Sequence, residues 1–238
     1  MTPGVLPDIF SQIPDLPRWV DARGLLLSRR GFLVDAADGC RVVCGRADRL
    51  IVPVTFDLTR ELDAIAAREV TGGATILLQE VMLPSARWLL QDWEAVPATV
   101  YALQPDRARD WRMPQWQTSP ISPSQLEAAR HLPNGLRATL LDVQNRSPVW
   151  AAMMDGQPLA FAWSMTATES WFQVWVETVE PARGKGLGRA AAMGLIVDRV
   201  LRGLRPVLRV AGTNLAGARL ARRLGFEAVD LHWLLTRA

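Results

Sequence analysis

The sequence predicts a mixed α/β fold: an α+β domain with a mixed sheet over residues 111–238, preceded by a smaller α+β domain over residues 1–110. Residues 171–179 alternate in the period-2 pattern of a strand. Residues 193–204 place apolar side chains at helical spacing, which predicts a long amphipathic helix. Between the halves, residues 104–124 contain four prolines, which is typical of a linker or an irregular connection.

Length and composition agree with this reading. The 238 residues allow one large domain or two small ones, and 49% hydrophobic with 21% charged residues excludes a wholly disordered chain.

The N-terminal part shows short periodic runs but no chemical signature. Residues 1–30 predict a short helix or coil. The expected strands cover residues 31–34, 40–44, 50–54, 75–78 and 96–103, and the expected helices cover 58–69 and 85–93.

The C-terminal part predicts an ordered series of elements. Two short helices, over about 122–131 and 136–143, precede three strands at 149–154, 159–166 and 171–179. A long helix from 187, a strand at 207–210, a helix at 214–224 and a strand at 229–235 follow. Gly225 is expected to end the second of these helices in a left-handed conformation.

A Gly-rich turn lies between the strand at 171–179 and the long helix. It reads Arg-Gly-Lys-Gly-Leu-Gly-Arg from Arg183 to Arg189. Glycines let the backbone approach a bulky anion, and a helix N-terminus offers unpaired N–H groups and a partial positive charge. The turn therefore predicts a phosphate or pyrophosphate site.

Two common phosphate motifs do not fit this turn. A Walker A loop needs Ser or Thr after its Lys, and here Gly186 follows Lys185. A dinucleotide fingerprint needs a glycine where Arg189 stands. A tight strand-to-helix turn without a ligand is the structural alternative.

The wider pattern resembles a known family. Residues 179–188 read Val-x-Pro-x-Arg-Gly-x-Gly-x-Gly, and downstream a strand, Asn214, a helix and Gly225-Phe226 follow. This pair of motifs resembles the acyl-CoA-binding segment of the GNAT acetyltransferase superfamily, over about residues 115–238. For residues 1–110, a degenerate second copy of the same fold is one alternative.

The resemblance implies an enzyme, an N-acetyltransferase. It would move an acetyl group from acetyl-CoA to a primary amine of a small molecule, amino acid or peptide by direct attack. The backbone at Thr178 and Val179 would pair with the pantetheine arm, and Asn214 would contact the same region. The pyrophosphate would be held at the turn, and two arginines would lie toward the 3′-phosphate. Of these two, Arg219 or Arg222 is assigned on electrostatic grounds alone. The full set is Thr178, Val179, Arg183, Gly184, Lys185, Gly186, Leu187, Gly188, Arg189, Asn214, Arg219 and Arg222.

The resemblance also suggests catalytic groups. Glu177 would be the general base, and the N–H of Val179 would polarise the acetyl carbonyl. Glu169 is a second choice of base, and a solvated strand glutamate is the structural alternative for Glu177. Many family members carry a Tyr that protonates the leaving thiolate, but here that position is Ala221 and the single Tyr is Tyr101. A catalytically silent acyl-CoA-binding module or sensor is therefore the alternative function.

Charge is distributed unevenly. Residues 181–238 hold ten Arg and Lys185 against three acidic residues, a net charge of +8, whereas residues 1–180 carry 16 basic and 21 acidic residues, a net charge of −5. We interpret this as a setting for the phosphates of coenzyme A. Nucleic-acid binding is an alternative class, but no array of stacking aromatic residues accompanies the arginines.

The expected partners are acetyl-CoA and an amine acceptor, with no metal, no membrane and no nucleic acid, in a monomer or homodimer. Cys40 and Cys44 are expected to be reduced thiols. With no signal peptide evident, we expect a cytoplasmic protein.

Overall fold

The computed structural model describes residues 6–35, 41–47, 49–55, 73–109, 111 and 115–237. The helix expected over 58–69 and Cys40 lie outside these ranges. The other predicted helices and strands are present, with ends that shift by a few residues.

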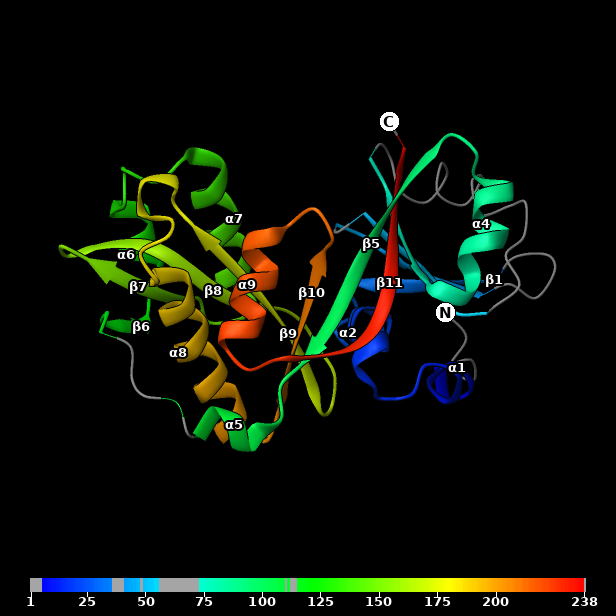
Figure 1. Ribbon diagram of the computed structural model, residues 1–238, viewed down its shortest axis with the longest axis horizontal. Helices are drawn as coiled ribbons and strands as arrows, with labels where there is room; N and C mark the ends of the chain where they lie inside the picture. Colours follow the sequence, from blue (N-terminus) through cyan, green and yellow to red (C-terminus); the bar gives the residue numbers. More distant parts are fainter. Residues whose placement is uncertain are drawn as a thin grey trace.

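All described strands form one mixed sheet of 11 strands in the order β1-β2-β3-β4-β11-β5-β10-β9-β8-β7-β6 (Figure 1). The strands are β1 (Gly31–Asp35), β2 (Arg41–Gly45), β3 (Leu50–Pro53), β4 (Thr75–Gln79), β5 (Trp93–Ala102), β6 (Thr118–Pro120), β7 (Trp150–Met154), β8 (Gln157–Ala167), β9 (Trp171–Thr178), β10 (Arg205–Ala211) and β11 (Glu227–Arg237). The described α-helices are α1 (Leu6–Gln12), α2 (Val20–Leu27), α4 (Leu83–Leu89), α5 (Pro105–Arg109), α6 (Pro123–Ala128), α7 (Asn134–Gln144), α8 (Leu187–Leu201) and α9 (Leu215–Arg223).

In the C-terminal half, helices cover both faces of the sheet. β7, β8 and β9 are antiparallel neighbours, and α8 connects β9 to the parallel strand β10. Because side chains alternate along a strand, Ala151 and Phe161 pack with the core beneath α6 and α7, whereas Ala152 and Ala160 pack with α8. The predicted order of elements is confirmed for this half.

The described elements of the N-terminal half follow the same order, and the helix expected between β3 and β4 lies outside the described residues. Helices α1 and α2 precede three antiparallel strands, β1 to β3, and β4 then runs parallel to β3 before α4 and β5. One core cluster contains residues of α1 and α2, and the cluster on the other face contains residues of α4. The repeat favours the interpretation of residues 1–110 as a second copy of the same fold.

The last strand of each half lies beside the other half. β5 pairs with β10, β11 pairs with β4, and β5 and β11 are antiparallel neighbours from Trp93 opposite Arg237 to Ala102 opposite Glu227. Figure 1 shows this pair, in green and red, between the two halves. The sheet is therefore continuous across residue 110, and the division of the chain at that residue stays a prediction.

Helix α2 also joins the halves. An added Cβ on Gly24 would lie 2.9 Å from the carbonyl oxygen of Ala167, so the absence of a side chain permits close contact between α2 and β8. Asp21, which is 3% exposed, forms an ion pair with Arg209 of β10. These contacts hold α2 against β8 and β10 of the C-terminal half.

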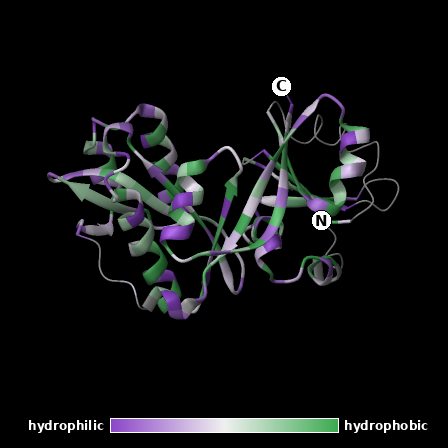
Figure 2. Ribbon diagram, viewed as in Figure 1, coloured by the Kyte–Doolittle hydropathy of each residue, from purple (hydrophilic) through white to green (hydrophobic). Residues whose placement is uncertain are grey.

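The described part of the proline-rich segment contains regular structure. Within residues 104–124, α5 and the short strand β6 form, and Trp111 and Trp116 pack against the core of the C-terminal half. Figure 2 shows hydrophobic residues concentrated along the strands and hydrophilic residues on outer helical turns. No described helix is both long and apolar enough to cross a membrane.

Candidate active site

Strands β9 and β10 separate toward their carboxyl ends. Their parallel pairing ends with Gln173 opposite Val207. β9 nevertheless continues to Thr178 and β10 to Ala211. Backbone groups in the later part of each strand therefore lack a partner across this divergence, which we call the opening. It lies at the end of parallel strands, where ligands commonly bind.

The Gly-rich turn lies directly after β9. Gly184 and Gly186 have φ angles of 79° and 87°, which favour glycine. The carbonyl of Gly186 accepts from the N–H of Ala190 at 3.1 Å, so the N–H groups of residues 187–189 have no partner inside α8. The turn thus presents backbone donors at the positive end of a helix, as predicted for an anion site.

Two contacts hold the turn in place. An added Cβ on Gly188 would lie 2.8 Å from Oγ1 of Thr178, so α8 begins close against the end of β9. The indole Nε1 of Trp116 donates to the carbonyl of Lys185 at 3.0 Å. The sequence gives no sign of this role for Trp116, because nothing in the local pattern connects it to a turn 69 residues away.

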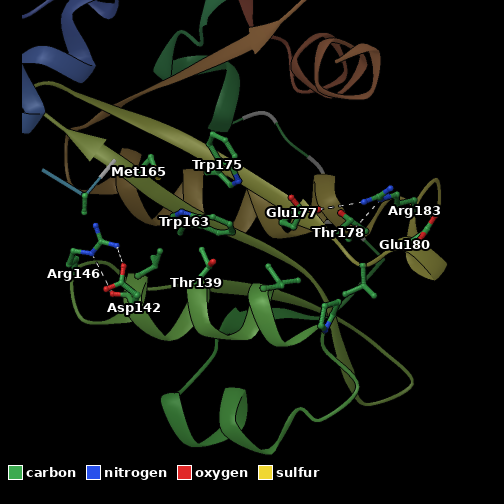
Figure 3. Close-up of a pocket in the computed structure, with 15 residues that line it drawn as sticks. Thr139, Asp142, Arg146, Trp163, Met165, Trp175, Glu177, Thr178, Glu180 and Arg183 are labelled. Carbon is green, nitrogen blue, oxygen red and sulfur yellow. Dashed lines mark hydrogen bonds and ion pairs between the residues drawn. The ribbon is translucent and has the colours of Figure 1, made fainter. Parts of the chain in front are cut away.

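A cavity of about 590 Å³ lies on the opposite side of β9 from α8. Its floor includes Trp163 and Trp175, whose ring centroids are 6.2 Å apart, and one wall is α7. Figure 3 shows Glu177 and Arg183 at one end of the cavity and Asp142 with Arg146 at the other. Ala47 of the N-terminal half also contributes to the lining.

Glu177 lies where the cavity meets the end of β9. Its side chain is 40% exposed, and Oε1 lies 3.7 Å from the guanidinium of Arg183. Arg183 also donates from Nε to the carbonyl of Thr178 at 3.2 Å. Arg183 therefore binds the strand end, and its predicted role toward pyrophosphate stays a prediction.

The backbone role assigned to Val179 does not fit this structure. Its N–H donates to the carbonyl of Leu159 in β8 at 2.9 Å and is therefore already paired. Because backbone groups alternate in direction along a strand, those of Val176 and Thr178 point toward β10 instead. The side chain of Val179 lines the cavity beside Glu177, as alternation predicted.

On α9, the predicted residues lie at or near the surface. Asn214 caps the helix, with Oδ1 accepting from the N–H of Gly217 at 2.8 Å. Arg219 and Arg222 are exposed. Ala221 is fully buried, and Tyr101 lies on β5 opposite Leu208.

Three other titratable side chains, those of Glu169, His131 and His232, are bonded to or buried within other parts of the fold. Both carboxylate oxygens of Glu169 accept from Arg23, and this hydrogen bonding holds the pKa of Glu169 below its usual value. Glu169 does not line the cavity, so it is a poor choice of base. His131 Nε2 lies 3.1 Å from the carbonyl of Pro158. His232 is 2% exposed, and burial, with Arg209 and Arg18 adding repulsion, lowers its pKa to about 3.

Among the residues that the structure describes, no group of three or more His, Cys, Asp or Glu side chains is placed to hold a metal ion.

Comparisons with known proteins agree with this arrangement. Residues 145–232 match the family model described as GNAT acetyltransferase. This match lies within the C-terminal half of the chain and includes the Gly-rich turn. No curated protein gives a significant match.

Solved structures extend the likeness in fold to the whole chain. A GCN5-related N-acetyltransferase-like protein from Streptococcus suis is 17% identical, with a TM-score of 0.70 over 98% of this chain and 97% of that chain. A GCN5-related N-acetyltransferase from Kribbella flavida is 18% identical, with a TM-score of 0.64 over 94% and 96%. The fold resemblance therefore includes residues 1–110, beyond the limit of about residue 115 set by the sequence motifs.

Proposed function

We propose that the protein transfers an acetyl group from acetyl-CoA to a primary amine by direct attack. The observation that carries this proposal is the opening between β9 and β10, which ends in the backbone donors of the Gly-rich turn. An extended pantetheine arm fits between separated strands because it can bond to their backbone groups. A pyrophosphate fits the N-terminus of α8.

In this proposal, the acetyl carbonyl is polarised by the N–H of Val176 or Thr178 rather than by that of Val179. The neutral amine attacks the carbonyl carbon, the new C–N bond forms, and the C–S bond breaks. Glu177, directly or through water, takes the proton that the amine nitrogen loses. The departing thiolate takes a proton from water and leaves as the free thiol of coenzyme A.

The distribution of cations supports coenzyme A over nucleic acid. Arg209 and Arg202 of the basic C-terminal quarter pair with Asp21 and Asp198. Those arginines therefore serve the fold and do not form a continuous basic face. A cytoplasmic location stays a prediction.

A silent acyl-CoA-binding module is the second candidate, and the buried Ala221 favours it. No side chain at that position can protonate the thiolate. A coenzyme thiol, however, has an intrinsic pKa near that of Cys, about 8.5, so water is a sufficient proton source.

Replacement of Glu177 by Gln separates these candidates. We expect kcat to fall by roughly 10²–10⁴-fold, as for loss of a general base, with the Kd for acetyl-CoA unchanged. The measurements are release of coenzyme A thiol across a panel of amines and calorimetry with acetyl-CoA. Binding without turnover in the wild type would favour the silent module, and absence of binding would contradict both candidates.

A further inference from the structure

A second cavity adjoins the first at Arg146. It has a volume of about 360 Å³ and shares Val143, Arg146 and Met165 with the larger cavity. Its remaining lining comes from three regions: the end of α2 with the start of β1, the end of β8, and Arg199 of α8 with Ser147. The combined space therefore runs from Glu177 to the boundary with the N-terminal half.

Among the described residues, the polar lining of the second cavity consists of cations and hydroxyl groups and contains no carboxylate. Three arginines contribute, Arg30, Arg146 and Arg199, together with the hydroxyl groups of Ser28, Ser147, Ser164 and Thr166. Arg30 donates to the carbonyl of Met165 at 2.8 Å, which anchors it at the cavity wall. Arg146 pairs with Asp142, which lines the larger cavity.

Arg199 is more buried than Arg146, and its ion pair is longer than that of Arg146. Its side chain is 17% exposed, and it donates to Oγ of Ser147 at 3.0 Å. Its Nε forms a long ion pair, at 4.0 Å, with Oδ2 of Asp198, whose other oxygen accepts from Arg202. Among the described residues, neither this Nε nor this Oδ2 has a hydrogen-bond partner, and both atoms are buried. Burial lowers the pKa of Arg199, but a guanidinium stays charged in a protein. A buried cation of this kind is stabilised by an anion that hydrogen-bonds to it.

The region between the two ends is apolar. Trp163, Trp175, Leu136 and Met165 line it, and Figure 3 shows the two tryptophans between Glu177 and Arg146. An acceptor whose amine lies at Glu177 therefore places its body on the tryptophans and its far end toward the arginines.

We propose, on the basis of the acetyltransferase function above, that the acceptor is an amphipathic primary amine with an anionic group at its far end. The anion is a carboxylate or a phosphate ester, held by Arg146 and Arg199 with Ser147. A simple α-amino acid with an uncharged side chain does not meet this requirement, because its carboxylate is adjacent to its amine. The N-terminal half completes the acceptor site through Ser28 and Arg30.

Three probes of similar shape test the inference: 4-(aminomethyl)benzoate, 4-(aminomethyl)phenyl phosphate and benzylamine. Their binding is measured by calorimetry with coenzyme A present, for the wild type and for Arg199→Met. Arg137→Met is the matched control, since Arg137 also lies on the C-terminal half but lines neither cavity.

We expect at least one anionic probe to bind the wild type and the control about tenfold or more tightly than benzylamine does. In Arg199→Met, this ratio of Kd values should fall below about threefold. The preferred anion shows whether carboxylate or phosphate is the natural group. Equal binding of all three probes to the wild type would overturn the inference, as would an unchanged preference in folded Arg199→Met. Acetyl-CoA binding and thiol release, measured separately, decide the proposed function, so the two failures are distinguishable.

Discussion

At the scale of single residues, the structure depends on a few backbone positions. Gly186 begins α8 with a φ of 87°, a conformation that a β-branched side chain strongly disfavours. Its neighbour Lys185 is exposed, and the indole of Trp116 contacts its carbonyl rather than its side chain. The proposed anion site thus depends on backbone geometry more than on charged side chains.

Gly186→Val should therefore weaken binding of acetyl-CoA. Strain of about 1–3 kcal/mol moves the turn away from its binding geometry, so we expect the Kd to rise roughly tenfold or more. Lys185→Arg, as the control, should change the Kd by less than a few-fold. Calorimetry measures both, with thermal unfolding to show that the variants are folded. An equal, small effect of both substitutions would argue against the turn as the pyrophosphate site.

Trp116→Phe tests the contact that fixes this turn. The ring is retained and one hydrogen bond is lost, which contributes about 0.5–1.5 kcal/mol net. We expect the Kd for acetyl-CoA to rise by roughly two- to tenfold with little change in Tm. Trp111→Phe is the matched control, because Trp111 packs on the same core and no contact with the turn is seen. A clear fall in Tm together with an unchanged Kd for acetyl-CoA would show that Trp116 serves packing alone.

At the scale of elements, the local sequence patterns predicted most helices and strands. They did not predict which strands pair with one another in the sheet. The strand at 171–179 and the helix from 187 were readable because each carries a complete period-2 or period-3.6 pattern. β6 was missed because it has three residues, one of them Pro120, and exists only through pairing with β7. The position of β11 between β4 and β5 has no local signature, since alternation does not specify a partner.

The candidate site shows the same limit. The Gly-rich turn and the shared face of Glu177 and Val179 followed from sequence, because both are local. The N–H of Val179 was misassigned because its direction depends on the register with β8, where it meets Leu159. Arg199 was not identified, because the second cavity gathers residues from several elements distant in sequence.

Strand β11 also carries a buried titratable group. His232 has a pKa lowered to about 3, below its ordinary value of 6.5, so it is neutral in the folded protein near neutral pH. Unfolding lets it bind a proton below about pH 6.5, so stability is fully present above that pH and falls as the pH decreases toward 3. Between pH 7.5 and 5, this group should remove about 2 kcal/mol from the free energy of unfolding.

Urea unfolding at the two pH values measures this loss, with His232→Leu as the comparison. The variant should lose about 2 kcal/mol less than the wild type over the same interval. Identical losses in both proteins would show that His232 is not the titrating group.

At the scale of the whole molecule, the last strand of each half pairs with strands of the other half. This pairing makes the two halves interdependent. β10 and β11 belong to the C-terminal half, yet both pair with β5 of the N-terminal half. A fragment of residues 111–238 would expose the edge of β10 and leave β11 without either neighbour. Exposed edges of this kind favour association rather than stable folding.

We therefore expect the 111–238 fragment to show no cooperative thermal unfolding and to aggregate, whereas the full chain unfolds cooperatively. Circular dichroism with light scattering measures both properties. A monomeric fragment with a sharp transition would show that β5 is dispensable.

The central claim is that acyl-CoA lies between β9 and β10 with its pyrophosphate on the turn before α8. A crystal structure of the full chain with acetyl-CoA tests it most directly. We predict pyrophosphate oxygens within hydrogen-bond distance of N–H groups from residues 184–189, and pantetheine along β9 near Thr178. Acetyl-CoA bound elsewhere, with the turn and the opening empty, would contradict the claim.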